Sequence, residues 1–186
     1  MIHKLEKILF EKTKDSQSDI LYTQWIYDKK LVPRALSLIA GIFPHYSMHD
    51  QSHSETIINN IVRIVGEDVI EKFTAIDIWL LLTSAYYHDI GMAIPADRIE
   101  EALKSKDFLS YISDIQSDSS HPLYLYASHF KEEHRQLVLK DSSFNINIYD
   151  SVKFLLADYF RRFHANRSEQ IIINPEKEIS LNSPRG

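Results

Sequence analysis

The sequence has no cysteine among its 186 residues. Disulfide frameworks, thiolate zinc sites and cysteine nucleophiles are therefore excluded, and any bound metal must be held by nitrogen and oxygen ligands. Long apolar runs are also absent, because none reaches the roughly 18 residues that a membrane-spanning helix requires. Residues Met1–Phe10 mix charged and apolar side chains and lack the apolar core of a signal peptide. We expect a cytoplasmic protein with no membrane partner.

A surplus of basic residues is absent too. The chain has 21 Lys and Arg residues against 26 Asp and Glu residues, which gives a formal net charge of −5. Proteins that bind nucleic acid along its phosphate backbone usually carry a basic surplus, so nucleic acid is not an expected partner. The content of 44% hydrophobic and 25% charged residues is typical of a soluble globular protein, and the length suits one domain.

Glycine and proline are scarce, with four and six residues, and this favours helices joined by short turns. Apolar residues recur with helical spacing along most of the chain, and a strand is expected only at Ile171–Ile173. The sequence therefore predicts an all-α fold. Helices are expected at Ile2–Lys12, Asp19–Lys30, Arg34–Ile42 (with Pro33 near its first turn), Ser52–Val65, from Thr74 to just before Gly91, Leu123–Lys140 and Asp150–His164.

Two of these helices carry recognisable end signals. Ser52 with Glu55, and Thr74 with Asp77, match the spacing of a capping box. We expect Gly91 in a left-handed conformation just after the helix that starts near Thr74. That helix is apolar nearly all round, so we expect it to be central and buried.

Three histidines stand at the ends of apolar stripes. Residues three or four positions apart share a helix face, so each of these imidazoles should extend a buried stripe. The stripes are His53, Ile57 and Ile61; Ile78, Leu81, Ala85 and His88; and Leu156, Phe160 and His164. Asp89 follows His88 directly, in the last turn of its helix.

These groups require partners if they are buried. An unpaired buried carboxylate costs several kcal/mol, and the end of a helix favours a cation by about 0.3–1 kcal/mol. A divalent ion such as manganese, iron, zinc, nickel or magnesium would satisfy the imidazoles and the carboxylate together. The alternative is that the histidines are hydrogen-bonded core residues and that the His88–Asp89 pair occurs by chance.

Four segments together resemble a known family. His53 on an aliphatic helix, followed by Tyr87–Met92 with the sequence YHDIGM, is similar to the HD-domain superfamily of metal-dependent phosphohydrolases. The segments Phe43–Asp50 and Arg161–Ser168 extend the likeness to the HD-CE subgroup, in which an HD domain precedes a GHKL-type ATPase module. The resemblance spans roughly residues 45 to 168.

The resemblance implies an HD-domain helical bundle and a divalent metal ion held by His53, His88 and Asp89, with Asp89 also taking part in catalysis. In that superfamily a later aspartate completes the ligand set, but no aspartate follows His164 in this sequence. Either the chain is an N-terminal fragment or the site is degenerate, and the polar tail favours the fragment. The domain organisation expected is N-terminal helices at 1–44, an incomplete HD domain at 45–173 with a pocket-shaping insert at 95–147, and a tail at 174–186.

The same resemblance suggests further site residues. His164 is expected to be catalytic, as a proton donor or phosphate contact, and Arg167 one turn later to be a second phosphate contact. The alternative for Arg167 is a solvated basic patch with its neighbouring arginines. His49 and His129 are weaker candidates for substrate binding: His49 is expected in a loop, and His129 on a surface helix that could still line the pocket.

The implied function is hydrolysis of a nucleotide or related phosphoester by a metal-bound water, with His164 protonating the leaving oxygen. A second hypothesis is a sensor domain that binds nucleotide or metal without turnover and regulates a fused GHKL-type ATPase. A third is a helical interaction module in which His53, His88 and Asp89 are dispensable. The missing aspartate shifts the balance away from turnover in this chain.

Overall fold

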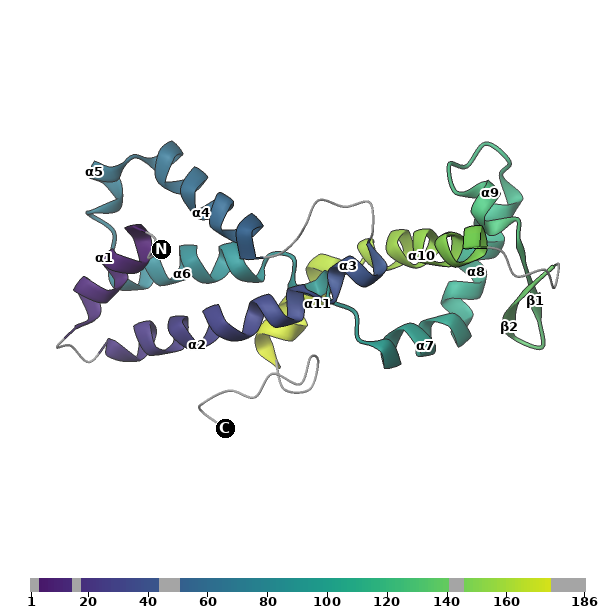
Figure 1. Ribbon diagram of the computed structural model, residues 1–186, viewed down its shortest axis with the longest axis horizontal. Coiled ribbons are helices and arrows are strands. Elements are labelled where there is room, and N and C mark those ends of the chain that lie inside the picture. Colours follow the sequence, from purple (N-terminus) through teal and green to yellow (C-terminus); the bar gives the residue numbers. More distant parts are fainter. Residues whose placement is uncertain (1–3, 15–17, 44–50, 141–145, 175–186) are drawn as a thin grey trace.

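The computed structural model describes residues 4–14, 18–43, 51–140 and 146–174, which form an elongated helical molecule (Figure 1). The prediction of an all-α fold is confirmed, because helices dominate and one small hairpin is the only sheet in the described part of the chain. The elements are α1 Lys4–Thr13, α2 Asp19–Leu36, α3 Ile39–Ile42, α4 Gln51–Val65, α5 Glu67–Ile70, α6 Ala75–Tyr87, the 3-10 helix η1 Ile90–Met92, α7 Ala96–Lys104, α8 Lys106–Ser117, α9 Tyr124–Ala127, β1 Phe130–Glu133, β2 Gln136–Leu139, α10 Ile146–Arg161 and α11 His164–Ile173.

Helix α6 is the element around which the first half of the chain packs. Helices α1, α2 and α4 all contact it, and Figure 1 shows α6 between α4 and α2. Its buried side chains include Ile78, Leu82 and Tyr86, and the Tyr86 ring meets Trp25 of α2 edge-on. The helix is central, as predicted, but its burial is incomplete, because one face remains exposed at Ile76 and Leu80.

The start of α6 follows from its sequence. The Thr74 hydroxyl accepts a hydrogen bond from the Asp77 backbone N–H, and the Asp77 carboxylate accepts one from the Thr74 N–H. This confirms the predicted capping box. The Thr74 hydroxyl also donates to the Asp77 carboxylate, and this bond together with the one from the Thr74 N–H lowers the pKa of Asp77. The other predicted box is wrong, because α4 already begins at Gln51 and Ser52 lies inside it.

Two helix boundaries in the first half also differ from the prediction. Helix α2 continues through Pro33 to Leu36, and α3 is a separate turn at Ile39–Ile42. A proline can occupy a helix interior when tertiary packing outweighs its missing N–H, and the neighbouring Val32 and Leu36 are both buried.

Gly91 brings α11 against the turn that follows α6. It has no left-handed backbone, contrary to the prediction, and it lies inside η1. A Cβ atom at this position would lie 2.0 Å from the His164 carbonyl oxygen and 2.7 Å from the backbone nitrogen of Ser168. Glycine is therefore required here because another backbone approaches so closely.

The region from Leu123 to Lys140 is a short helix and a hairpin, so the single helix predicted there is wrong. Strands β1 and β2 pair antiparallel, with Phe130 opposite Leu139. The chain reverses at His134 and Arg135, which both have positive φ angles of 52° and 62°. Two consecutive left-handed residues end any α-helix and match the twist of a two-residue hairpin loop.

The last two helices differ from the prediction as well. Helix α10 ends at Arg161, and His164 is the first residue of α11 and so does not share a helix with Leu156 and Phe160. The strand predicted at Ile171–Ile173 is wrong, because these residues belong to α11. Ser168 and Ile171 share the buried face of this helix, which packs against η1 as an element.

Apolar side chains of both halves join one core cluster, which includes Leu9, Trp25, Phe108 and Leu155. Within the described segments, no helix combines the length and the apolar character that crossing a bilayer requires.

Candidate metal centre

The candidate ligands come from two neighbouring helices that run in opposite directions. His53 lies in the first turn of α4, while His88 and Asp89 follow the last residue of α6 (Figure 1). Because α4 packs against α6, the start of one helix lies beside the end of the other. This packing brings together residues that are 35 positions apart in the sequence.

The three side chains converge on one point. One ligand atom from each of His53, His88 and Asp89 lies within 4.8 Å of the other two. The two Nε2 atoms are 3.3 Å apart, and the Asp89 Oδ2 atom lies 3.6 Å from Nε2 of His53 and 2.6 Å from Nε2 of His88. The predicted convergence of these three residues is therefore present.

These separations fit a divalent ion. Ligand atoms at roughly 2.0–2.2 Å from a tetrahedral ion lie about 3.4 Å from one another, close to two of the three separations. The shortest, between His88 and Asp89, is a hydrogen bond that a cation would replace. Two imidazole nitrogens and a carboxylate oxygen form a donor set suited to zinc, iron, manganese or nickel.

The site lies at the edge of the core. The carboxylate of Asp89 is 12% exposed, whereas the side chains of His53 and His88 are 31% and 36% exposed. His53 therefore does not continue a fully buried stripe, since the buried face of α4 carries Ser54 and Ile58. A partly open site leaves room for water or a substrate beside the ligands.

His88 is held in the orientation that a metal ligand needs. Its Nδ1 atom lies 3.1 Å from the Ala85 carbonyl oxygen, and in donating to that oxygen it leaves Nε2 directed at His53 and Asp89. Metal-binding histidines commonly donate their second N–H to a carbonyl or carboxylate in this way. The hydrogen bond to Asp89 raises the pKa of His88, while partial burial opposes that shift.

His164 and Arg167 are not part of this cluster. The His164 carbonyl lies against Gly91, and its imidazole is half-buried, with Nδ1 2.7 Å from the Arg161 carbonyl oxygen. Arg167 donates from Nη2 to the Ala93 carbonyl oxygen, so one of its donors is used to bind the segment after η1.

His129 stands apart from the site. His129 is exposed between α9 and β1, at the end of the molecule opposite α4 (Figure 1). His49 lies outside the described residues.

One polar residue at the site was not predicted individually. The Ser168 hydroxyl is bonded to the backbone on both sides of Asp89, at His88 and at Gly91. It belongs to the segment Arg161–Ser168 that carried the family resemblance, but its contact with the turn spans 77 residues and has no local signal in the sequence.

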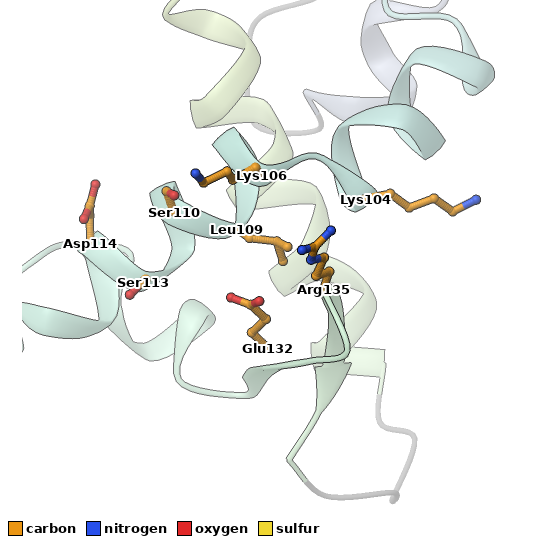
Figure 2. A pocket seen from close by; sticks show the side chains of 8 residues that line it. All are labelled: Lys104, Lys106, Leu109, Ser110, Ser113, Asp114, Glu132 and Arg135. Carbon is orange, nitrogen blue, oxygen red and sulfur yellow. The ribbon is translucent and has the colours of Figure 1, made fainter.

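A separate hollow of about 590 Å³ lies between α8 and the hairpin (Figure 2). Its lining combines cations, carboxylates and hydroxyls: Lys104, Lys106, Leu109, Ser110, Ser113, Asp114, Glu132 and Arg135. All of them belong to the predicted insert 95–147, and none is a candidate metal ligand.

Comparison with models of protein families identifies the family of this chain. A family model described as HD-CE matches residues 43–185, which is most of the chain and includes all three ligands. The chain belongs to the HD-CE family. Neither the curated proteins nor the solved structures gave a match. Membership of the HD-CE family agrees with the helical fold and with the position of the His–Asp pair at the end of α6.

Metal binding at this HD-CE site is expected to strengthen as the pH rises. A bound ion needs the neutral form of His88, whose raised pKa keeps the imidazole protonated to a higher pH than usual. Below that pKa, at least one proton must leave for each ion bound, so the affinity should fall by at least about tenfold per pH unit. Calorimetric titration with Mn²⁺ from pH 6 to 8, in two buffers of different ionisation enthalpy, measures the affinity and the number of protons released. An affinity independent of pH, with no proton release, would contradict this linkage.

Proposed function

We propose that this HD-CE chain binds a divalent metal ion through His53, His88 and Asp89 and hydrolyses a phosphoester of the nucleotide class. The observation that carries the proposal is the convergence of two imidazole nitrogens and one carboxylate oxygen to within 4.8 Å. Three protein ligands with open positions beside them are the usual arrangement of a catalytic rather than a structural metal site.

When bound, the ion would polarise a phosphoryl oxygen and acidify a coordinated water molecule. The protein groups have separate tasks around it. His53 and His88 bind through Nε2, and the Ala85 carbonyl fixes the ring of His88. Asp89 supplies negative charge and, in the absence of metal, accepts a hydrogen bond from Nε2 of His88. The partial exposure of both histidines leaves a path for a phosphate group.

His164 is the proposed proton donor. If its Nδ1–H donates to the Arg161 carbonyl oxygen, Nε2 is left to carry the proton that the leaving oxygen requires. Its backbone packs against Gly91, only two residues after Asp89, which ties the start of α11 to the ligand-bearing turn. Arg167, one turn later, is a proposed phosphate contact through donors other than the one that binds Ala93.

A second candidate is a sensor domain that binds nucleotide or metal without turnover and regulates a GHKL-type ATPase module. One observation favours it: within the described residues the cluster has only three protein ligands. A site with fewer charged ligands holds its ion less tightly and suits a regulatory role as well as a catalytic one.

The two candidates differ in turnover. We expect the Mn²⁺-loaded chain to release product from at least one of a nucleoside triphosphate, a nucleoside monophosphate and bis-p-nitrophenyl phosphate. Asp89→Ala should lower the rate at least about 100-fold, because it removes both a ligand and the charge that balances the ion. Release of phosphate and of nitrophenol is measured for the wild type and the variant, with the Mn²⁺ concentration adjusted to give both proteins equal metal occupancy.

Asp97→Ala is the matched control, since Asp97 is an exposed carboxylate in the first turn of α7. It should retain the wild-type rate. A wild-type chain that binds Mn²⁺, is thermally stabilised by nucleotide and turns over none of these substrates would overturn the hydrolase proposal in favour of the sensor.

A further inference from the structure

Ser168 of α11 lies on the turn that presents the metal ligands. Its hydroxyl accepts a hydrogen bond from the Gly91 N–H at 2.9 Å and donates one to the His88 carbonyl oxygen at 3.2 Å. These two backbone groups bracket Asp89. A single side chain from a helix 77 residues away thus joins the two ends of the segment that carries the ligands.

The surroundings of the Ser168 hydroxyl leave little space for another arrangement of its hydrogen bonds. Ser168 is 7% exposed, and Gly91 is buried against it without space for a Cβ atom. If the hydroxyl were removed, the buried N–H of Gly91 would lose this partner. A buried donor without a partner is costly, so the turn would rearrange to find another one.

We propose that Ser168 is a positioning residue of the metal centre, which sets the conformation of the His88–Gly91 turn and thereby the spacing of the His88 and Asp89 ligand atoms. The proposal rests on the metal-binding part of the proposed function and is independent of whether the site hydrolyses a substrate. Removing a group that orients a metal ligand without touching the ion typically weakens metal binding by about 10- to 100-fold.

The test compares two serines with the same bonding pattern. Ser105 accepts a hydrogen bond from the Phe108 N–H and donates one to the Ala102 carbonyl oxygen, at the start of α8 and away from the ligands. Both Ser168→Ala and Ser105→Ala therefore remove one accepted and one donated bond. Only the first change touches the metal-binding turn.

Titration with Mn²⁺ and the visible absorption of the Co²⁺-loaded protein are the readouts. Ser168→Ala is expected to weaken Mn²⁺ binding about 10- to 100-fold and to shift the Co²⁺ ligand-field bands. Ser105→Ala is expected to keep the wild-type affinity and bands even where it lowers the melting temperature. A Ser168→Ala protein with wild-type affinity and bands would overturn the proposal, whereas a wild-type protein that binds neither ion would overturn metal binding itself.

A second measurement uses the wild-type chain and is independent of how the variant folds. Metal binding and the Ser168 bond should stabilise the same turn, so Zn²⁺ is expected to slow hydrogen exchange of the Gly91 amide at least about tenfold. The Phe108 amide, which is bonded to Ser105 in the same manner, should exchange at an unchanged rate. Equal exchange of the Gly91 amide with and without bound metal would contradict the role assigned to Ser168.

Discussion

His88→Ala is expected to weaken binding of Mn²⁺ or Zn²⁺ by more than about 100-fold, which exceeds the loss usual for a residue that only supports a ligand. His88 is central to the cluster, because its Nε2 atom lies 3.3 Å from that of His53 and 2.6 Å from the Asp89 carboxylate. Its removal leaves two ligand atoms 3.6 Å apart, which cannot retain a divalent ion against water. The measurement is calorimetric titration, supported by the melting temperature with and without metal.

The gain in folding stability on metal binding has an expected size. A ligand present at 100 times its Kd stabilises a folded protein by about 2.7 kcal/mol, and this gain should vanish in His88→Ala. His121→Ala is the matched control, because His121 is a half-buried histidine outside the cluster whose Nδ1 accepts from the Leu123 N–H. Equal metal stabilisation of wild type and His88→Ala would exclude the proposed ligand set.

Gly91→Ala is expected to destabilise the fold by at least about 2 kcal/mol. The new Cβ atom would lie 2.0 Å from a backbone carbonyl oxygen of α11, and backbone cannot move aside as a flexible side chain can. The turn and α11 must separate, which also disturbs the Ser168 bond to the Gly91 N–H. Urea denaturation followed by circular dichroism measures the loss as a lower midpoint.

Gly41→Ala provides the matched control for this change. Gly41 lies in α3, and a Cβ atom there would meet no heavy atom within 4 Å. Alanine is favoured over glycine in a helix by up to about 1 kcal/mol, so this variant should be as stable as the wild type or more stable. If the two variants had the same midpoint, the close approach of α11 to Gly91 would not exist in solution.

Local signals in the sequence predicted the elements that position the site. The capping box at Thr74 and Asp77 fixes where α6 begins, and its apolar pattern carries it to His88. Gly66 follows the last residue of α4 with a positive φ angle of 86°, a backbone conformation that glycine adopts without steric cost. These features depend on residues within a few positions of one another.

Features that depend on distant packing were not predictable in this way. Gly91 has the same local context as a helix-ending glycine, but its role is set by the backbone of His164, which lies far along the chain. Ile171 and its neighbours have high β propensity, yet the contact of α11 with η1 makes them helical. His134 and Arg135 have positive φ angles in the hairpin turn, although the sequence holds neither glycine nor asparagine there to indicate that conformation.

The candidate site was predicted in part from physics and in part from resemblance. Helical spacing indicated that His53 and His88 lie at the ends of apolar faces, but it could not bring two separate helices together. The likeness to HD domains supplied that convergence, and the geometry agrees with it. The tie from Ser168 to the Asp89 turn required atomic positions, because a hydroxyl bonded to two backbone groups has no pattern in the sequence.

The most direct test of the metal centre is anomalous diffraction from crystals of this chain soaked with Mn²⁺. We expect one strong anomalous peak at roughly 2.0–2.3 Å from Nε2 of His53, Nε2 of His88 and a carboxylate oxygen of Asp89. A fully soaked crystal with no peak there, or with its strongest peak at another group of residues, would contradict the assignment of these three residues as metal ligands.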